Sequence, residues 1–189
     1  MKVIYRIYQV LIALPILVIA TVITALITIS CFAHPNAHWL NRVQALWARM
    51  FCYLLFIPVT ISGLENVQPN QSYVFVSNHQ SSYDIFIIYG WLPTIFKWLM
   101  KAELKRIPFV GWACQAAGHI FIQRGSAIGA QHSLQEVEKS LTNGISTVIF
   151  PEGTRTPDGQ LGRFKRGAFQ VAIDVKLPII PISLSGCYE

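Results

Sequence analysis

A histidine and an aspartate stand five residues apart in a polar segment of the chain, at His79 and Asp84. An imidazole beside a carboxylate can take a proton from an alcohol, because the carboxylate selects the ring tautomer and stabilises the imidazolium that forms. The pattern alone is also compatible with a surface pair or a helix-capping pair. As a catalytic pair it predicts a general base, with His79 as the base and Asp84 as the residue that orients it.

The spacing of this pair restricts the local structure that can bring the two side chains together. On an ideal helix, residues five apart point about 140° away from each other. The pair can therefore meet only across a turn, with Asp84 at or near the start of a helix. Ser81 and Ser82 suit such a turn and can cap the helix. The apolar run that ends before Ser77 predicts a strand, and α/β sheets bind ligands at the carboxyl ends of their strands.

A second polar block, at Glu152, Gly153 and Arg155, follows another β-rich run later in the chain. Glycine permits a tight turn, and arginine presents a planar, permanently charged fork that matches a phosphate group. The alternative is a surface arginine that pairs with Glu152. Arg124 follows a third strand-like run and has a similar interpretation. The candidate phosphate-binding residues at these positions are Arg155, Arg124, Glu152 and Gly153.

These residues belong to four blocks that occur in a fixed order. The blocks are Asn-His-x4-Asp at 78–84, Gly-x-x-Phe-Ile-x-Arg at 118–124, Phe-Pro-Glu-Gly-Thr-Arg at 150–155 and a proline-punctuated run at 177–181. In their order and rough spacing they resemble the glycerolipid acyltransferase family that includes the 1-acyl-glycerol-3-phosphate acyltransferases. The resemblance covers residues 60 to 185 and is specific, whereas residues 1 to 59 match only in their hydrophobic character.

The resemblance implies an acyltransferase that acts on a membrane lipid. His79 would deprotonate the free hydroxyl of 1-acyl-glycerol-3-phosphate, which would attack the thioester of acyl-CoA or acyl-carrier protein and give phosphatidic acid. Such a step needs no serine or cysteine nucleophile, so we expect direct transfer without an acyl-enzyme. The resemblance also implies that Lys101 is a candidate phosphate-binding residue, with a solvated lysine as an equal alternative. Two alternatives stay open, namely transfer to another lysophospholipid and a catalytically silent membrane adaptor.

Strand-like and helix-like segments alternate after residue 70, which predicts an α/β domain with a largely parallel sheet flanked by helices. The expected strands cover 72–77, 95–100, 119–123, 146–150 and 179–185. The expected helices cover 84–91, 102–106, 127–141 and 164–175. The domain is expected to run from 60 to 189. Because members of the resembled family usually continue beyond the last strand, we expect its C-terminal flank to be missing or short.

Residues 1–59 are predicted to form a membrane-associated helical hairpin. Val10 to Ala33 contains no charged residue and is long enough to span a bilayer. A second apolar stretch, from Val43 to Val59, carries Arg49, which favours an interfacial, partly immersed helix. Two basic residues near the N-terminus favour a cytoplasmic start. A hairpin then returns the basic domain to the cytoplasmic side of a bacterial-type inner membrane; a single-pass anchor is the alternative.

The composition is typical of a protein that contacts a membrane, and the cysteine spacing gives no sign of a metal site. The chain is 53% hydrophobic and only 13% charged, against a usual charged share of about a quarter. Its net charge of +6 suits an anionic membrane surface and an acidic acyl donor, and no nucleic-acid motif is present. The four cysteines have no metal-ligand spacing and are expected to be reduced. We therefore expect neither a metal nor a cofactor beyond the acyl-carrying co-substrate.

Overall fold

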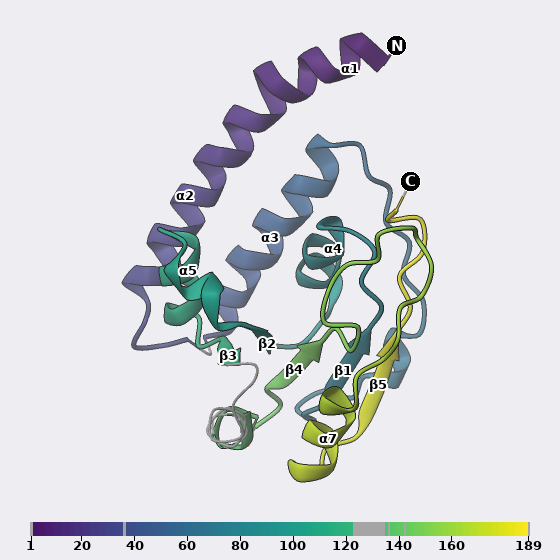
Figure 1. Cartoon of the computed structure of the whole chain (residues 1–189). Coiled ribbons are helices and arrows are strands. Elements are labelled where there is room, and N and C mark those ends of the chain that lie inside the picture. The colour runs from purple at the N-terminus through teal and green to yellow at the C-terminus, as the bar shows by residue number, and fades with distance from the viewer. Residues whose placement is uncertain (1, 36, 123–134, 136, 142, 189) are drawn as a thin grey trace.

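A five-stranded sheet forms the centre of the structure (Figure 1), a computed structural model that describes residues 2–35, 37–122, 135, 137–141 and 143–188. The strands are β1 Val74–Ser77, β2 Phe96–Lys101, β3 Ile120–Ile122, β4 Ser146–Ile149 and β5 Ile179–Ile182, in the order β3-β2-β4-β1-β5. Every pairing is parallel. The expected strands are all present and the predicted fold class is confirmed.

Helices connect the strands, as a parallel sheet requires. They are α4 Tyr83–Trp91, the 3₁₀ helix η3 Ala102–Arg106, α5 Val110–Ala116 and α7 Arg166–Asp174, and a short 3₁₀ turn, η2 Leu64–Asn66, precedes β1. Helix α5 was not predicted, because Pro108 was interpreted only as the end of the preceding helix. Of the helix expected over 127–141, Gln135 and residues 137–140 are helical, and most of the remainder lies outside the described residues.

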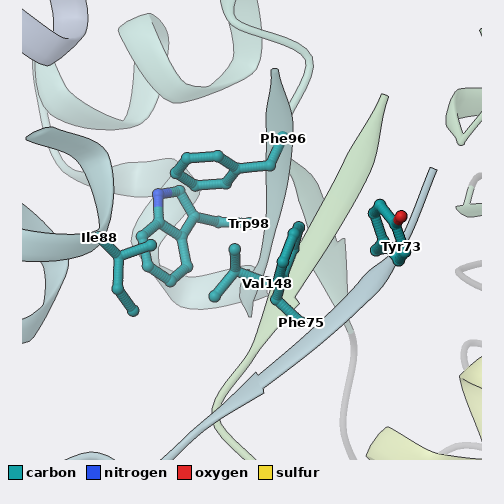
Figure 2. Packing of buried hydrophobic residues seen from close by; sticks show 6 residues of the cluster. All are labelled: Tyr73, Phe75, Ile88, Phe96, Trp98 and Val148. Atoms are coloured by element: carbon teal, nitrogen blue, oxygen red, sulfur yellow. The ribbon is translucent and has the colours of Figure 1, made fainter. Parts of the chain in front are cut away.

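Both faces of the central strands are buried. Phe75 of β1 and Val148 of β4 pack with Trp98 of β2 and Ile88 of α4 (Figure 2). The alternate residues of β1 face α7, where Ala168 and Ala172 cover them. All residues of β1 and β4 are buried, so packing on both faces holds these strands in place. The loops that follow them therefore start from fixed positions.

The N-terminal region is a helical hairpin, as predicted. Helices α1 Lys2–Tyr8 and α2 Leu14–Ser30 are joined by the π-helical turn η1, Gln9–Ala13, and α3 His38–Leu54 returns beside them (Figure 1). Tyr8 Oη donates to the Leu54 carbonyl at 2.9 Å, and Trp47 Nε1 donates to Thr21 Oγ1 at 3.0 Å. The π-helical turn precedes Pro15, whose ring has no N–H to donate and displaces the carbonyl of the preceding turn.

The two arms of the hairpin have different surroundings. The continuous helix Lys2–Ser30 is long and apolar enough to cross a membrane, and most of it is exposed. Helix α3, which is expected to be partly immersed, packs along α4. Phe51 stacks on Phe86 with ring centroids 4.1 Å apart, and Arg49 Nε donates to the Gly90 carbonyl at 2.6 Å. Arg49 therefore has a hydrogen-bond partner in the α/β domain, and the partial immersion of α3 stays a prediction.

A buried lysine ties the hairpin turn to the sheet. Lys97, in β2, is only 4% exposed, and its Nζ donates to the carbonyls of Ala117 at 2.6 Å and Pro35 at 3.0 Å. Burial lowers the pKa of Lys97 from its ordinary value of 10.5 to about 8. The ammonium is held by carbonyl dipoles, which stabilise a buried positive charge less than a carboxylate would.

We predict that Lys97 makes stability depend on pH above neutrality. Between pH 8 and 10.5 the unfolded chain keeps a proton that the folded chain has released, so stability rises with pH across this window. The shift corresponds to about 3 kcal/mol. The apparent melting temperature of the full chain in detergent should rise from pH 8 to pH 10 relative to that of Lys97→Met. Parallel curves for the two proteins would contradict the prediction.

Candidate active site

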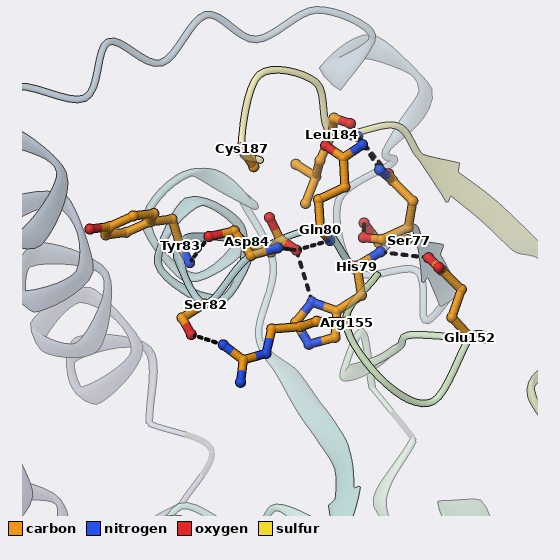
Figure 3. Close-up of polar contacts among 12 residues, drawn as sticks. Ser77, His79, Gln80, Ser82, Tyr83, Asp84, Glu152, Arg155, Leu184 and Cys187 are labelled. Atoms are coloured by element: carbon orange, nitrogen blue, oxygen red, sulfur yellow. Dashed lines mark hydrogen bonds and ion pairs between the residues drawn. The ribbon is translucent and has the colours of Figure 1, made fainter. Parts of the chain in front are cut away.

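The predicted pair meets across a turn between β1 and α4. His79 Nδ1 lies 2.8 Å from Asp84 Oδ2 (Figure 3). The same oxygen accepts the backbone N–H groups of Gln80 at 2.7 Å and Ser81 at 2.9 Å. Asp84 lies in the first turn of α4, and Ser82 occupies the N-cap position without a side-chain capping bond. The Asp84 carboxylate therefore closes the turn and holds the imidazole with one oxygen.

The geometry leaves His79 Nε2 as the basic nitrogen. Asp84 is fully buried, so its carboxylate keeps Nδ1 as the donor, and the His79 side chain is 14% exposed. Among the described residues, no group hydrogen-bonds to Nε2. The ring stacks on Phe150 of the following block, with centroids 3.9 Å apart and planes 11° apart. The imidazole is thus fixed on the core and open at one nitrogen, as a general base requires.

Glu152 joins the loop after β4 to the loop after β1. Its Oε1 accepts the His79 N–H at 2.8 Å and its Oε2 accepts the Gly162 N–H at 2.9 Å. A third link is the Thr156 N–H, which donates to the His79 carbonyl at 3.0 Å. Gly153 has φ +74°, a backbone conformation that favours glycine, and makes the turn that aims Glu152 inward. The buried carboxylate binds backbone amides rather than a neighbouring arginine.

We predict that Glu152→Gln destabilises the loop pair. Glutamine offers one acceptor oxygen and one NH₂, so one of the two backbone N–H groups would face another donor. A buried unsatisfied donor costs about 1–3 kcal/mol. Thermal unfolding should show a lower melting temperature for Glu152→Gln, whereas the exposed Glu103→Gln should leave it unchanged. A Glu152→Gln protein as stable as the Glu103→Gln control would refute the bridging role.

Arg155 lies beside the base without a carboxylate partner. Its Nη1 donates to Ser82 Oγ at 2.6 Å, and Figure 3 shows the Arg155 side chain passing the His79 ring with its guanidinium near Ser82. No ion pair to Arg155 occurs within the described part of the chain. The arginine borders a hollow of about 290 Å³ that Arg163 also lines. The alternative in which Arg155 pairs with Glu152 is wrong, because both oxygens of Glu152 face backbone amides.

The remaining sequence candidates are less closely placed. Lys101 ends β2, and because all strands are parallel it lies at the same sheet edge as the loops after β1 and β4. Its side chain is exposed and has no described contact with His79 or Arg155. Arg124 lies outside the described residues. The structure thus brings five of the candidates together: His79, Asp84, Glu152, Gly153 and Arg155.

Two contacts from the end of the chain had no signal in the sequence. Asn78 Nδ2 donates to the Leu184 carbonyl at 2.9 Å, and the Leu184 N–H donates to Asn78 Oδ1 at 2.8 Å. These bonds use both ends of the amide, in agreement with a structural role for Asn78. The Cys187 thiol lies beside Asp84 (Figure 3), and burial, followed by the charge of that carboxylate, raises the pKa of Cys187 to about 12.

A parallel α/β sheet with a His–Asp pair at its carboxyl edge, next to an arginine that has no carboxylate partner among the described residues, defines the class: an α/β protein with a candidate ligand site where such sheets bind ligands. Residues 58–185 match the family described as Acyltransferase. The chain belongs to this family.

Relatives and one solved structure agree with this assignment. The chloroplast 1-acyl-sn-glycerol-3-phosphate acyltransferase LPAT1 of Arabidopsis thaliana is 38% identical, over 76% of this chain and 40% of its own. The 1-acyl-sn-glycerol-3-phosphate acyltransferase of Pseudomonas aeruginosa is 34% identical, over 78% and 53%. The crystal structure of the acyltransferase PlsC from Thermotoga maritima superposes with a TM-score of 0.66 at 30% identity, over 79% of this chain and 59% of that one. The chain spans about half the length of the curated relatives it matches.

Proposed function

We propose that the chain transfers an acyl group from a thioester donor to the free hydroxyl of 1-acyl-glycerol-3-phosphate and so makes phosphatidic acid. The observation that carries the proposal is that an open His79 Nε2 and Arg155, which has no carboxylate partner in the described part of the chain, lie at the same sheet edge. The names of the relatives support the acceptor. Arg155 would hold the acceptor phosphate, with Arg124 and Lys101 as further cations, while Glu152 and Gly153 would contribute by holding the loop.

The proposed reaction balances without a metal or a resident cofactor. His79 Nε2 takes the proton of the acceptor hydroxyl as its oxygen attacks the thioester carbonyl. The tetrahedral intermediate collapses with cleavage of the carbon–sulfur bond, and the proton on His79 passes to the departing thiolate. The products are an ester and a free thiol. Asp84 accepts the hydrogen bond from Nδ1 and so stabilises the imidazolium that forms.

The test is an assay of the purified full chain with lysophosphatidic acid and either labelled acyl-CoA or acyl-carrier protein. We expect phosphatidic acid and free thiol in equal amounts, and the faster of the two donors identifies the carrier. A panel of lysophospholipids distinguishes this acceptor from other head groups. Thiol release without acceptor would indicate a hydrolase, and no turnover with any pair would indicate a silent adaptor.

The proposed topology keeps the site on the cytoplasmic side of a bacterial-type inner membrane. Lys2 and Arg6 favour a cytoplasmic N-terminus, and the antiparallel hairpin returns the domain to the same side. We predict that Lys2→Cys and Lys139→Cys, each in a chain without other cysteines, react with an impermeant reagent from the same side of sealed vesicles. Labelling from opposite sides would show that the N-terminal helix is a single span.

A further inference from the structure

The segment between β2 and β3 carries an exposed apolar surface that the proposed reaction does not use. Every residue from 104 to 110 is exposed, and this run contains Leu104, Ile107, Phe109 and Val110. Trp112, in the first turn of α5, is 52% exposed, and its ring centroid lies 5.4 Å from that of Phe109. We call these five residues the α5 patch. A cluster of exposed apolar side chains of this kind on a protein surface indicates an interaction site rather than a solvated loop.

The backbone holds the α5 patch in a defined shape. A Cβ on Gly111 would lie 2.4 Å from the Lys105 carbonyl oxygen, so only glycine lets α5 fold back this closely on η3. Phe109 adopts φ +59° at the start of α5, in the left-handed region that non-glycine residues seldom occupy. The strain is held in place by the N–H of Gly111, which donates to the Ile107 carbonyl at 2.7 Å. The exposed rings are thus presented on a rigid tip.

The surroundings of the α5 patch point to lipid as its partner. Helix α5 packs against α2 (Figure 1), which is part of the helix long and apolar enough to cross a membrane. The α5 patch therefore lies next to the element best suited to contact lipid. Lys105 and Arg106 stand inside the run and Lys101 precedes it, against one acidic residue, Glu103. Aromatic rings interleaved with cations are the composition of the membrane–water interface, where the rings enter the headgroup region and the cations meet anionic lipid.

We propose that the α5 patch is a second membrane-contact element, which inserts Phe109 and Trp112 into the interface of an anionic leaflet beside the hairpin. The α/β domain would then be fixed to the bilayer at two places, the hairpin and the patch. Because Lys101 joins β2 directly to η3, the second contact would orient the carboxyl edge of the sheet relative to the lipid surface.

Tryptophan quenching in the full chain tests this proposal with conservative substitutions. The protein is reconstituted in vesicles with anionic lipid, and emission is quenched either with brominated lipid or with aqueous iodide. Replacing Trp112 by phenylalanine should remove a share of the lipid-quenched emission and leave the iodide-quenched emission unchanged. The control is Trp98→Phe, because Trp98 is buried in the core and should contribute to neither quenched share.

Each other outcome of this experiment contradicts lipid contact. If Trp112→Phe removes iodide-quenched emission, Trp112 faces water. If it removes emission that neither quencher reaches, protein covers the α5 patch, and a second copy of the chain becomes the partner to test by cross-linking.

The same quenching measurement in vesicles of different charge tests the preference for anionic lipid. The lipid-quenched share of Trp112 should be at least about twofold larger in anionic than in neutral vesicles, since each basic residue near the surface is attracted to anionic lipid. Lys105→Gln combined with Arg106→Gln should abolish this difference, whereas the control Lys139→Gln combined with Lys176→Gln should preserve it. If the variant with Lys105→Gln and Arg106→Gln keeps the difference between anionic and neutral vesicles, these two residues do not bind anionic lipid.

Discussion

Replacing His79 by alanine is expected to lower turnover by at least about 10²-fold, a typical contribution of a general base. The acceptor hydroxyl would lose the only open imidazole nitrogen that the described site offers, while Asp84 would keep its bonds to the Gln80 and Ser81 amides. The turn between β1 and α4 should therefore survive. The measurement is phosphatidic acid formation per mole of protein, with melting temperature and vesicle binding determined on the same preparations.

Two further variants separate catalysis from folding in this experiment. Asp84→Asn should also reduce turnover but leave more residual activity, because the imidazole remains with its orientation weakened. His38→Ala serves as the matched control, since His38 is exposed at the start of α3, away from the turn. A His79→Ala protein within a few-fold of the parent would exclude His79 as the base.

Arg155→Ala is expected to act mainly on acceptors that carry a phosphomonoester. Removing the guanidinium should lower kcat/KM for lysophosphatidic acid by roughly 30- to 700-fold, equivalent to about 2–4 kcal/mol, as for truncation of one partner of a charge pair. The decrease in kcat/KM should be far smaller for lysolipids without a phosphomonoester. The measurement is kcat/KM across a head-group series, and Arg155→Lys should recover part of the loss because it restores charge without the planar fork.

Ser82→Ala distinguishes a phosphate contact from a structural one. Ser82 Oγ accepts the hydrogen bond from Arg155 Nη1, so this variant removes the protein's own contact and keeps the cation. If Arg155 serves acceptor binding, Ser82→Ala should retain most of the discrimination between head groups. Equal losses for charged and uncharged acceptors in Arg155→Ala would show that Arg155 has a structural role.

The order of strands along the chain was predictable because each strand is locally encoded. Apolar, β-rich runs bounded by turn residues mark β1 and β4, and their alternation with helical patterns requires a parallel sheet. The meeting of His79 and Asp84 was also predictable, since a spacing of five allows contact only across a turn. Short elements were harder: α5 has only seven residues, too few for a hydrophobic period to stand out.

The sequence by itself therefore determined the sheet, the helical hairpin and the meeting of His79 with Asp84, because all three depend on local pattern and spacing. Only the tertiary structure decided how segments far apart in the chain meet. The order β3-β2-β4-β1-β5 makes β1 and β4 neighbours, and this adjacency lets Glu152 bind the His79 amide and leaves Arg155 without a carboxylate. The packing of α3 on α4 likewise gives Arg49 its partner, the Gly90 carbonyl. Such contacts join groups whose local sequence is equally compatible with solvent, so only the packing of the whole chain selects them.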